Sequence, residues 1–383
     1  SDPAAAHVVE QGGEAGGVAG AAQLVAAQGA PVIGGLSDAF GRRPVLLLAV
    51  LGLGVDYALT ALSPTIGWLF AGRIIAGVFG ASYTTANAYI ADVTPPDERG
   101  KAFGMLGAAF GVGFVVGPAI GGLLGDLGPR VPFFVAAGLS LANFVYGFVF
   151  LPETHPKEKR KPLRFRQIHP FGAVANIPGG KHVRILVLAL FVLFLGSAVY
   201  PSVWGFWANA RFDWSPRTIG LSLAAYGVTT SIAQALLVGF FTKRWGERKT
   251  ALVGLSITVV SLVLNALAWK SWMVFVIIFA ASPSGVSMPA MNAWMSKLAP
   301  DDAQGRLQGS IGAAESLSSI FGPLLMTQVF GAFEHTMPGA PFLVAALLSV
   351  VALAIATRAA PPPEGTDEES ETKGAALPNP PGA

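Results

Sequence analysis

The sequence predicts an all-α polytopic membrane protein, and three observations support that prediction. Hydrophobic residues make up 52% of the 383-residue chain and charged residues 12%, about half the share usual in soluble proteins. Apolar runs of about 20 residues, the length that crosses a bilayer, follow one another along the chain. The runs also lack the alternation that is typical of membrane β-strands. This composition excludes most soluble classes and all disordered ones.

Eleven apolar runs are expected to cross the membrane. They lie near 15–36, 44–63, 67–91, 102–125, 131–151, 183–207, 218–241, 250–269, 271–295, 308–331 and 338–357. We expect an N-terminal half at 1–151 with five spans, a central cytoplasmic loop at 152–182 and a C-terminal six-helix half at 183–358. The Pro-rich and acidic segment 359–383 is expected to be a disordered cytoplasmic tail.

The positive charges of the loops predict the orientation. Nineteen Lys and Arg fall on one side of the expected bundle and four on the other, so the positive-inside rule places the richer side in the cytoplasm. The basic run 157–166 could also be a nucleic-acid patch or an anionic-lipid site, but basic loops beside spans are the norm. We therefore expect no nucleic-acid partner, and a multi-pass protein of the inner (plasma) membrane with its C-terminus in the cytoplasm.

The chain matches itself at an offset of 205 residues. The identities lie mostly at expected helix ends and include Gly34 with Gly239, Gly41 with Gly246, Arg43 with Arg248, Pro95 with Pro300, Asp97 with Asp302, Gly100 with Gly305, and Gly117-Pro118 with Gly322-Pro323. The repeat predicts two halves of like topology, related by an axis along the membrane normal. The span near 183–207 has no partner in the first half. We therefore expect that a first helix is missing from this sequence, by truncation or mis-annotation.

Catalytic chemistry has little support in the sequence. Cysteine is absent, and no pair of the five histidines has metal-ligand spacing, so we expect no metal site. A set of nucleophile, histidine and acid is also missing, and we expect that the protein is not an enzyme.

Three motifs of the first half identify a family by resemblance. Gly34 to Pro44 is a glycine-rich loop with an acid and two arginines, Ala88 to Asp92 ends a span, and Gly113 to Gly122 is a glycine-rich stretch of a later span. Together they resemble the drug/proton antiporter branch of the major facilitator superfamily, in particular the tetracycline/proton antiporter family. The segments 220–224 and 307–310 also look like that family. The resemblance implies a major facilitator fold with two six-helix halves.

Charges gather at the cytoplasmic end of the first half, and their repeat copies have the opposite sign. Asp38 aligns with Lys243, Arg42 with Glu247 and Asp92 with Lys297. We expect Asp38, Arg42, Arg43 and Asp92 to form a cytoplasmic gate whose ion pairs hold one conformer and break in the other. The alternative is solvated loop charges worth under about 1 kcal/mol each. Ala39 stands where the family usually has a basic residue, which weakens the expected network.

Three charges lie inside expected spans, namely Asp56, Arg73 and Glu315. An ionised group at the bilayer centre costs about 2.5–3.5 kcal/mol, so each should face a partner or a wet cavity. We expect Asp56 to be a proton- or substrate-linked acid, with a structural ion pair to Arg73 as the alternative. The resemblance implies that Arg73 matches the buried arginine of the family's fourth helix and tunes the pKa of a carboxylate. Glu315 is a second candidate for proton coupling, with snorkelling to the surface as the alternative.

Glycines and a proline mark the span 102–125. They are Gly113, Gly117, Pro118, Gly121 and Gly122. They permit a kink and close helix packing, and in the family this stretch marks antiporters. A plain packing kink would rest on the same residues, so residue type alone does not separate the two interpretations.

Polar and aromatic residues supply a candidate substrate cavity. Its members are Asn87, Tyr200, Trp204, Gln234, Met288 and Asn292. Tyr200, Trp204 and Trp207 lie at helical spacing at the end of a span. They could stack on an aromatic drug, and an interfacial aromatic belt is the favoured alternative.

The expected function is export of a small amphipathic drug, tetracycline-like by resemblance, in exchange for protons by alternating access. The small molecule, protons and the bilayer are the expected partners. We expect no bound cofactor, although Mg²⁺ could travel with the substrate. One departure is that Ser256 to Val259 holds no acid where the similar exporters carry a ninth-helix carboxylate. A multidrug or metabolite exporter that does not recognise tetracycline, and an inactive truncated fragment, are the alternatives.

The orientation can be tested by labelling single cysteines, because the chain has none of its own. Cysteines placed in 41–44, 153–182 and 243–249 should react with an impermeant reagent only from the cytoplasmic side. Protection of 153–182 from that side would contradict the topology, because eight of the counted positive charges lie in this loop and its flank.

Overall fold

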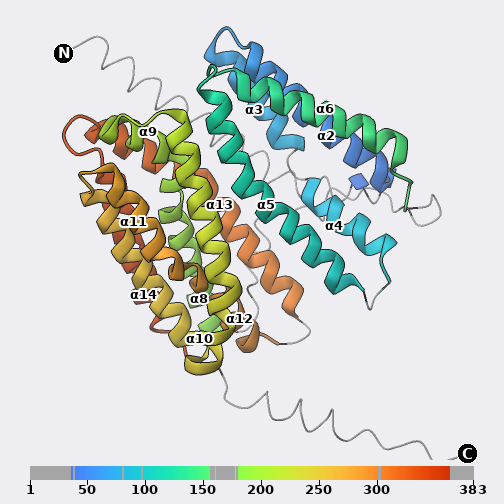
Figure 1. The fold of residues 1–383 in the computed structure, drawn as a ribbon. Coiled ribbons are helices and arrows are strands. Elements are labelled where there is room, and N and C mark those ends of the chain that lie inside the picture. Colours follow the sequence, from blue (N-terminus) through green and yellow to red (C-terminus); the bar gives the residue numbers. More distant parts are fainter. Residues whose placement is uncertain are drawn as a thin grey trace, which may run out of the picture.

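The computed structural model describes residues 36–37, 39–79, 82–95, 98–155, 160, 177, 180–300 and 303–362. These residues form helices and connecting turns without a strand, so the all-α prediction is confirmed for this part of the chain. Figure 1 shows two helical bundles, the first blue to teal and the second green to red. The expected span 15–36, apart from Leu36, and the tail beyond 362 lie outside the described residues.

In the described residues, the first bundle shows five helices. They are α2 (Arg42–Leu62), α3 (Ile66–Phe79), α4 (Ser82–Val93), α5 (Arg99–Gly125) and α6 (Val131–Phe150). Helix α2 packs on α3, α4 and α6. The expected span 67–91 comprises both α3 and α4. Large side chains such as Leu139, Val145 and Phe148 are exposed on α6, as suits a surface that faces lipid.

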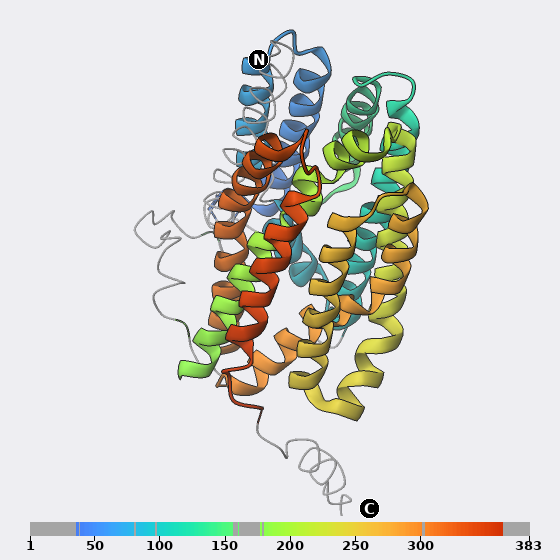
Figure 2. The same ribbon diagram turned by 90° about the vertical axis from the view of Figure 1, so that its left-hand side faces the viewer.

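The second bundle contains longer helical runs. They are α8 (Gly180–Ser197), α9 (Val199–Phe212), α10 (Pro216–Leu267), α11 (Ser271–Ala281), the 3₁₀ turn η3 (Ser282–Val286), α12 (Ser287–Leu298), α13 (Gln304–Phe333) and α14 (Ala340–Ala356). Figure 2 shows the second bundle from its side, and contacts join α8 with both α13 and α14. In the described chain, six helical runs are long and apolar enough to cross a membrane, and α14 is a shorter apolar helix. The total of eleven spans stays a prediction.

Helix α10 shows how local sequence sets the boundaries. Pro216 occupies its first turn, where a missing N–H costs nothing, and Ser215 caps it by accepting a hydrogen bond from the Thr218 N–H at 3.4 Å. The run turns sharply at Gly246, whose φ of 74° is a conformation that favours glycine. The turn divides α10 into two segments, which agree with the expected spans 218–241 and 250–269.

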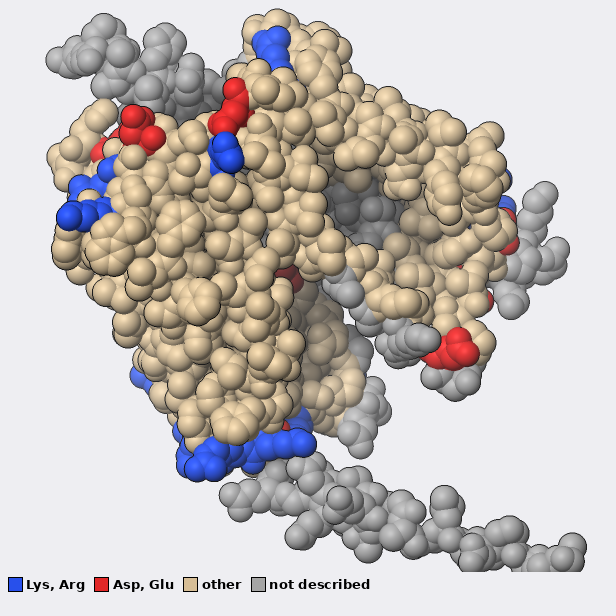
Figure 3. Space-filling view, viewed as in Figure 1, with Lys and Arg blue, Asp and Glu red and all other residues tan. Residues whose placement is uncertain are grey.

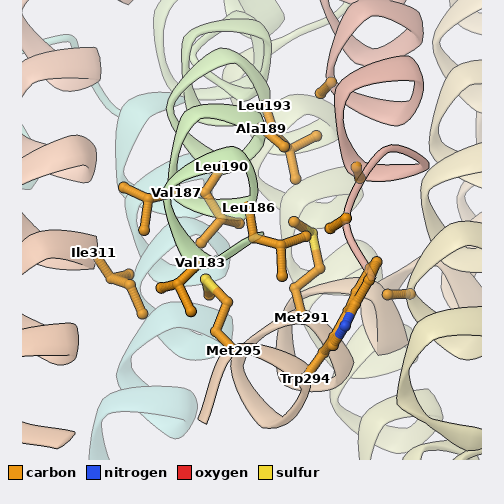
Figure 4. Close-up of a cluster of buried hydrophobic side chains, with 14 of the residues drawn as sticks. Val183, Leu186, Val187, Ala189, Leu190, Leu193, Met291, Trp294, Met295 and Ile311 are labelled. Carbon is orange, nitrogen blue, oxygen red and sulfur yellow. The ribbon is translucent and has the colours of Figure 1, made fainter. Parts of the chain in front are cut away.

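The core of the second bundle joins α8 with α12 and α13. Val183 and Leu186 of α8 are fully buried beside Met291 and Met295 of α12, and Ile311 of α13 completes the cluster (Figure 4). Lipid tails are as apolar as these side chains, so close van der Waals packing is what holds such helices together in a bilayer.

The two bundles meet where α5 crosses the first segment of α10. A Cβ atom on Gly220 would lie 2.9 Å from the Gly122 Cα, and one on Gly122 would lie 2.6 Å from the Pro216 carbonyl oxygen. The Asp126 side chain accepts a hydrogen bond from the Arg217 N–H at 3.3 Å just beyond the crossing. Figure 3 shows the bundles joined near the top of the molecule, with a hollow between them below. Glycine is needed at this crossing because no side chain fits between the two backbones.

This contact predicts the effect of a single methyl group. Gly220→Ala should push α5 and α10 apart and destabilise the protein by about 1–3 kcal/mol, the usual cost of overpacking. The measurement is the thermal unfolding midpoint of the purified protein in detergent. Gly239→Ala is the matched control, because open space surrounds a Cβ at that position of the same helix. Helix propensity alone would make that control neutral or up to about 1 kcal/mol more stable. Equal midpoints for the two variants would contradict the close crossing.

Candidate transport site

The acid Asp56 lies in the interior of the first bundle. It is 1% exposed and sits on α2 roughly 21 Å along the helix axis from Arg42 and about 9 Å from Leu62. A Cβ atom on Gly72 of α3 would lie 2.7 Å from Asp56 Oδ1, so a glycine on the neighbouring helix leaves room for this carboxylate. The Arg73 side chain is outside the described residues. The structure therefore places Asp56 between α2 and α3 and leaves its expected pairing with Arg73 a prediction.

A cavity of about 330 Å³ lies inside the second bundle. That size falls within the roughly 300–1,000 Å³ typical of small-molecule sites. Four of the expected cavity residues, Tyr200, Trp204, Gln234 and Met288, line it together with residues of α8, α10, α11 and η3. Asn292 is not among the residues that line it, and the Asn87 side chain is outside the described part of the chain.

Aromatic rings form one wall of this cavity. The Tyr200 and Tyr226 rings are stacked with centroids 5.6 Å apart, and Trp204 lies 5.8 Å from Tyr200. The Trp204 indole N–H donates to the Ser222 hydroxyl at 2.9 Å, which fixes the orientation of the ring. Trp207 is fully buried against Phe342 at 4.7 Å. The aromatic-belt interpretation was wrong, because belt residues face the membrane interface and both Trp204 and Trp207 are in the protein core.

A break in a helix brings polar backbone to the same cavity. The span 271–295 is interrupted by the 3₁₀ turn η3, and Ser284 and Gly285 of this turn line the cavity. A Cβ on Gly285 would lie 2.7 Å from Thr230 Cγ2, so the glycine lets η3 approach α10 closely. Interrupted helices are typical of transporter binding sites. Sequence reasoning missed this feature, although Ser282-Pro283-Ser284-Gly285 inside an apolar run was a visible signal.

Two ion pairs occupy equivalent places in the two halves. Arg42 Nε lies 3.3 Å from Asp92 Oδ2, and Lys297 Nζ lies 2.8 Å from Glu247 Oε1. An offset of 205 residues relates Arg42 to Glu247 and Asp92 to Lys297, so the pair is repeated with its charges exchanged. Each pair lies within one half and joins two of its helices. Figure 3 shows Lys and Arg gathered at the bottom of the second bundle, which is the end that holds the Gly246 turn.

The exchange of charge has opposite consequences at the helix ends. Glu247 opens the second segment of α10 and Lys297 lies in the last turn of α12, so both signs suit the helix dipoles. In the first half, Arg42 opens α2 and Asp92 ends α4, so both signs are unfavourable there. Glu153 compensates by accepting a hydrogen bond from the Arg42 N–H at 3.0 Å.

The Arg42–Asp92 pair also makes contacts with neighbouring residues. The Arg42 guanidinium donates to the buried Ser37 hydroxyl at 2.5 Å, and the Thr154 hydroxyl lies 3.4 Å from Asp92 Oδ2. Arg43 is a separate case, because it donates to the Phe148 carbonyl at 2.6 Å rather than to an acid. Asp38 lies outside the described residues. The structure thus brings Arg42 and Asp92 together, adds Glu153, which sequence reasoning missed, and leaves the gate a prediction.

Comparisons with known proteins settle the family. The family model of the Major Facilitator Superfamily matches residues 4–210 and 186–380. The tetracycline resistance protein, class C, of Escherichia coli is 41% identical over 86% of this chain and 83% of its own length. The class G protein of Vibrio anguillarum is 38% identical over 86% of this chain and 84% of its own length.

The chain belongs to the major facilitator superfamily, in the family of the tetracycline resistance proteins. The resemblance drawn from the motifs is thereby confirmed. Among solved structures, the human organic anion transporter MFSD10 (TETRAN) superposes with a TM-score of 0.64 at 25% identity, over 89% of this chain and 83% of that one. The protein is therefore a multi-pass membrane transporter of small molecules.

The glycines of α5 belong to the motif that marks antiporters in this family, and they differ in their surroundings. Pro118 and Gly122 form the crossing with α10, whereas the Cβ positions of Gly113, Gly117 and Gly121 have open space around them. The antiporter motif therefore has a packing face and an open face on one helix. Glu315 is exposed on α13, roughly 16 Å along the axis from Gln304, and lies apart from the cavity. Its role in proton coupling stays a prediction.

The ion pair in the second half predicts a charge-exchange experiment. Lys297→Glu should place two carboxylates together and lower stability by about 1 kcal/mol, since both side chains are partly buried. Adding Glu247→Lys should recover part of that loss, because the ion pair is restored although both exchanged charges then oppose the helix dipoles. Unfolding midpoints of the wild type, both single variants and the double variant give the coupling energy. The control is Lys249→Glu, the same change at an exposed position, with an effect within about 0.5 kcal/mol. Additive effects of the two substitutions would show that the pair contributes nothing.

Proposed function

We propose that this transporter exports a small amphipathic drug of the tetracycline type in exchange for protons, by rocking its two halves about a central site. The observation that carries the proposal is the buried carboxylate of Asp56. An ionised acid at that depth is costly, so taking up or releasing a proton there changes the free energy of the surrounding structure. A group of this kind can couple proton movement to a conformational change. The names of the class C and class G relatives support the choice of substrate.

The two halves differ, which suggests that the first binds the proton and the second holds the substrate cavity. Asp56 lies in the first half, whereas the cavity of about 330 Å³ lies in the second. The α5–α10 crossing joins the halves directly. Proton binding in the first half would change how the two halves pack and so change access to the cavity, which is the general scheme of alternating access.

Orientation and location complete the proposal. The excess of Lys and Arg in the loops supports an inner-membrane protein with its C-terminus in the cytoplasm. The charge pairs Arg42–Asp92 and Glu247–Lys297 would then lie at the cytoplasmic end. In the structure the halves touch at the opposite end, around Gly122 and Gly220, as expected of a conformer that opens to the cytoplasm.

Removal of the titratable group tests the coupling. In everted membrane vesicles that contain the chain, respiration should drive uptake of radiolabelled tetracycline, and an uncoupler should abolish the uptake. Asp56→Asn should reduce proton-driven accumulation at least tenfold, because an amide cannot exchange a proton. Counterflow of labelled against unlabelled tetracycline without a gradient should persist, which shows that the variant is folded. Glu98→Gln, a change at an exposed carboxylate, is the control and should transport normally.

Two results would count against the proposal. Normal accumulation in Asp56→Asn would show that this acid is not the coupling group, and Glu315→Gln would then be examined in the same assay. Absence of tetracycline uptake by the wild type, with uptake of other drugs, would instead favour the multidrug alternative.

A further inference from the structure

The start of α8 carries two cations without an anionic partner among the described residues. Lys181 and Arg184 are exposed, and neither side chain makes an ion pair or a hydrogen bond with the described part of the chain. Lys297, at the same end of the second bundle, is instead paired with Glu247 at 2.8 Å. The charges of Lys181 and Arg184 are therefore available to a ligand.

These two cations lie at a hollow on one face of α8. The hollow measures about 330 Å³, and the described residues that line it are Gly180, Lys181, Arg184, Ile185 and Leu188. The side chains recur at three- and four-residue spacing, so they share one face of the helix. This face is cationic at the start of α8 and apolar one turn farther on, where Leu188 is 52% exposed.

The contacts of α8 show that this face points out of the bundle. The α8 residues that line the transport cavity lie about 180° around the helix from it. Helix α13 flanks α8 on one side, where the Ser318 hydroxyl donates to the Phe191 carbonyl at 2.9 Å. Helix α14 flanks it on the other, where a Cβ on Gly196 would lie 3.1 Å from the Ala345 carbonyl oxygen. The hollow therefore opens on the outer surface, where a membrane protein meets lipid.

The spacing along α8 matches the depth of a lipid. Lys181 and Leu188 are separated by roughly 10 Å along the helix axis. The polar layer of one leaflet is about 5–8 Å thick. With Lys181 at the level of the phosphates, Leu188 therefore lies among the acyl chains. Arg184 stands between them, and its guanidinium can donate two hydrogen bonds to one phosphate.

Other ligands match this surface less well. A divalent cation prefers oxygen ligands such as carboxylates, and the described lining supplies none. A soluble phosphate would pair with the cations but leave Ile185 and Leu188 without a contact. A zwitterionic lipid brings a cation beside its phosphate, which Lys181 and Arg184 repel. An anionic phospholipid meets both the charged and the apolar part of the face.

We propose that this hollow binds one anionic phospholipid of the inner leaflet, with its phosphate at Lys181 and Arg184 and an acyl chain along Ile185 and Leu188. The positive end of the α8 dipole would add to the attraction for the phosphate. The inference goes beyond the proposed function. It takes from that proposal only the orientation that puts this end of the bundle at the inner leaflet.

Native mass spectrometry of the full chain in detergent counts bound lipids and gives their dissociation constants. Dioleoyl-phosphatidylglycerol is the anionic probe, and dioleoyl-phosphatidylcholine is the neutral probe with the same chains. The wild type should bind phosphatidylglycerol about 25-fold more tightly, since each cation beside an anionic headgroup is worth about fivefold. Lys181→Gln combined with Arg184→Gln should reduce this ratio to about one.

A matched pair of changes separates this site from general attraction to the basic end of the bundle. Lys243→Gln combined with Lys249→Gln also removes two exposed cations, and neither residue is among those that line the hollow. In about 0.15 M ammonium acetate, charges beyond roughly 8 Å are largely screened. This control should therefore keep the ratio within about twofold of the wild type.

Two further measurements complete the test. Arg184→Lys keeps the charge, so it should retain most of the preference, and it remains informative if the doubly substituted Gln variant does not fold. Glycerol phosphate is the soluble headgroup without acyl chains. At the concentration that saturates with phosphatidylglycerol, it should leave the lipid bound, because it cannot contact Leu188.

The outcomes are distinct from those of the transport assay, because lipid binding needs no proton gradient. A wild type without preference, equal losses in the two Gln pairs, a ratio near one in Arg184→Lys, or displacement of the lipid by glycerol phosphate would each overturn the inference. Failure of tetracycline export together with a retained phosphatidylglycerol preference would refute the proposed function and leave this inference standing.

Discussion

The high cost of placing a charge in hydrocarbon governs this structure. Charged residues are 12% of the chain, and in the described part they lie mainly at helix ends. Asp56 is a buried charge in the middle of a helix, 1% exposed, in a space that Gly72 keeps open. The polar side chains that line the cavity of the second half are all uncharged. One half therefore keeps an acid inside, while the other shows a neutral interior at its cavity.

The two halves share a backbone arrangement at equivalent positions, but their charges differ. Gly41 and Gly246 both adopt positive φ angles, 106° and 74°, and each precedes a residue of an ion pair. The pairs keep their positions but exchange their signs. In the second half the signs suit the helix dipoles, and in the first half Glu153 accepts a hydrogen bond from the Arg42 N–H at the helix start. The backbone is thus repeated more faithfully than the electrostatics.

Much of the fold could be predicted because a bilayer permits few solutions. Long apolar runs indicate helices, and the offset of 205 residues indicates two similar halves. The same offset predicted which charges correspond, and the structure pairs Arg42 with Asp92 in the first half and Glu247 with Lys297 in the second. Tyr200, Trp204, Gln234 and Met288 could be chosen in advance because polar and aromatic residues are notable in apolar spans.

The remaining features depend on distances that local sequence does not encode. Glu153 contacts a residue 111 positions away, so no local pattern predicts the contact. Thr258, Ser261 and Asn265 line the cavity but were missed, because short polar side chains in an apolar span often serve helix packing. The aromatic-belt interpretation was wrong because the position of a residue along a span does not reveal which side of the helix faces protein.

The location of the first ion pair also bears on biosynthesis. The hydrogen-bonding and ionic partners of Arg42 and Asp92 described above lie between Ser37 and Thr154. All of these residues are translated before the second bundle begins at Gly180. The first bundle can therefore complete its charge network while the rest of the chain is still being translated. The second bundle then packs against the first at the α5–α10 surface, where Gly122 and Gly220 allow the two helices to approach closely.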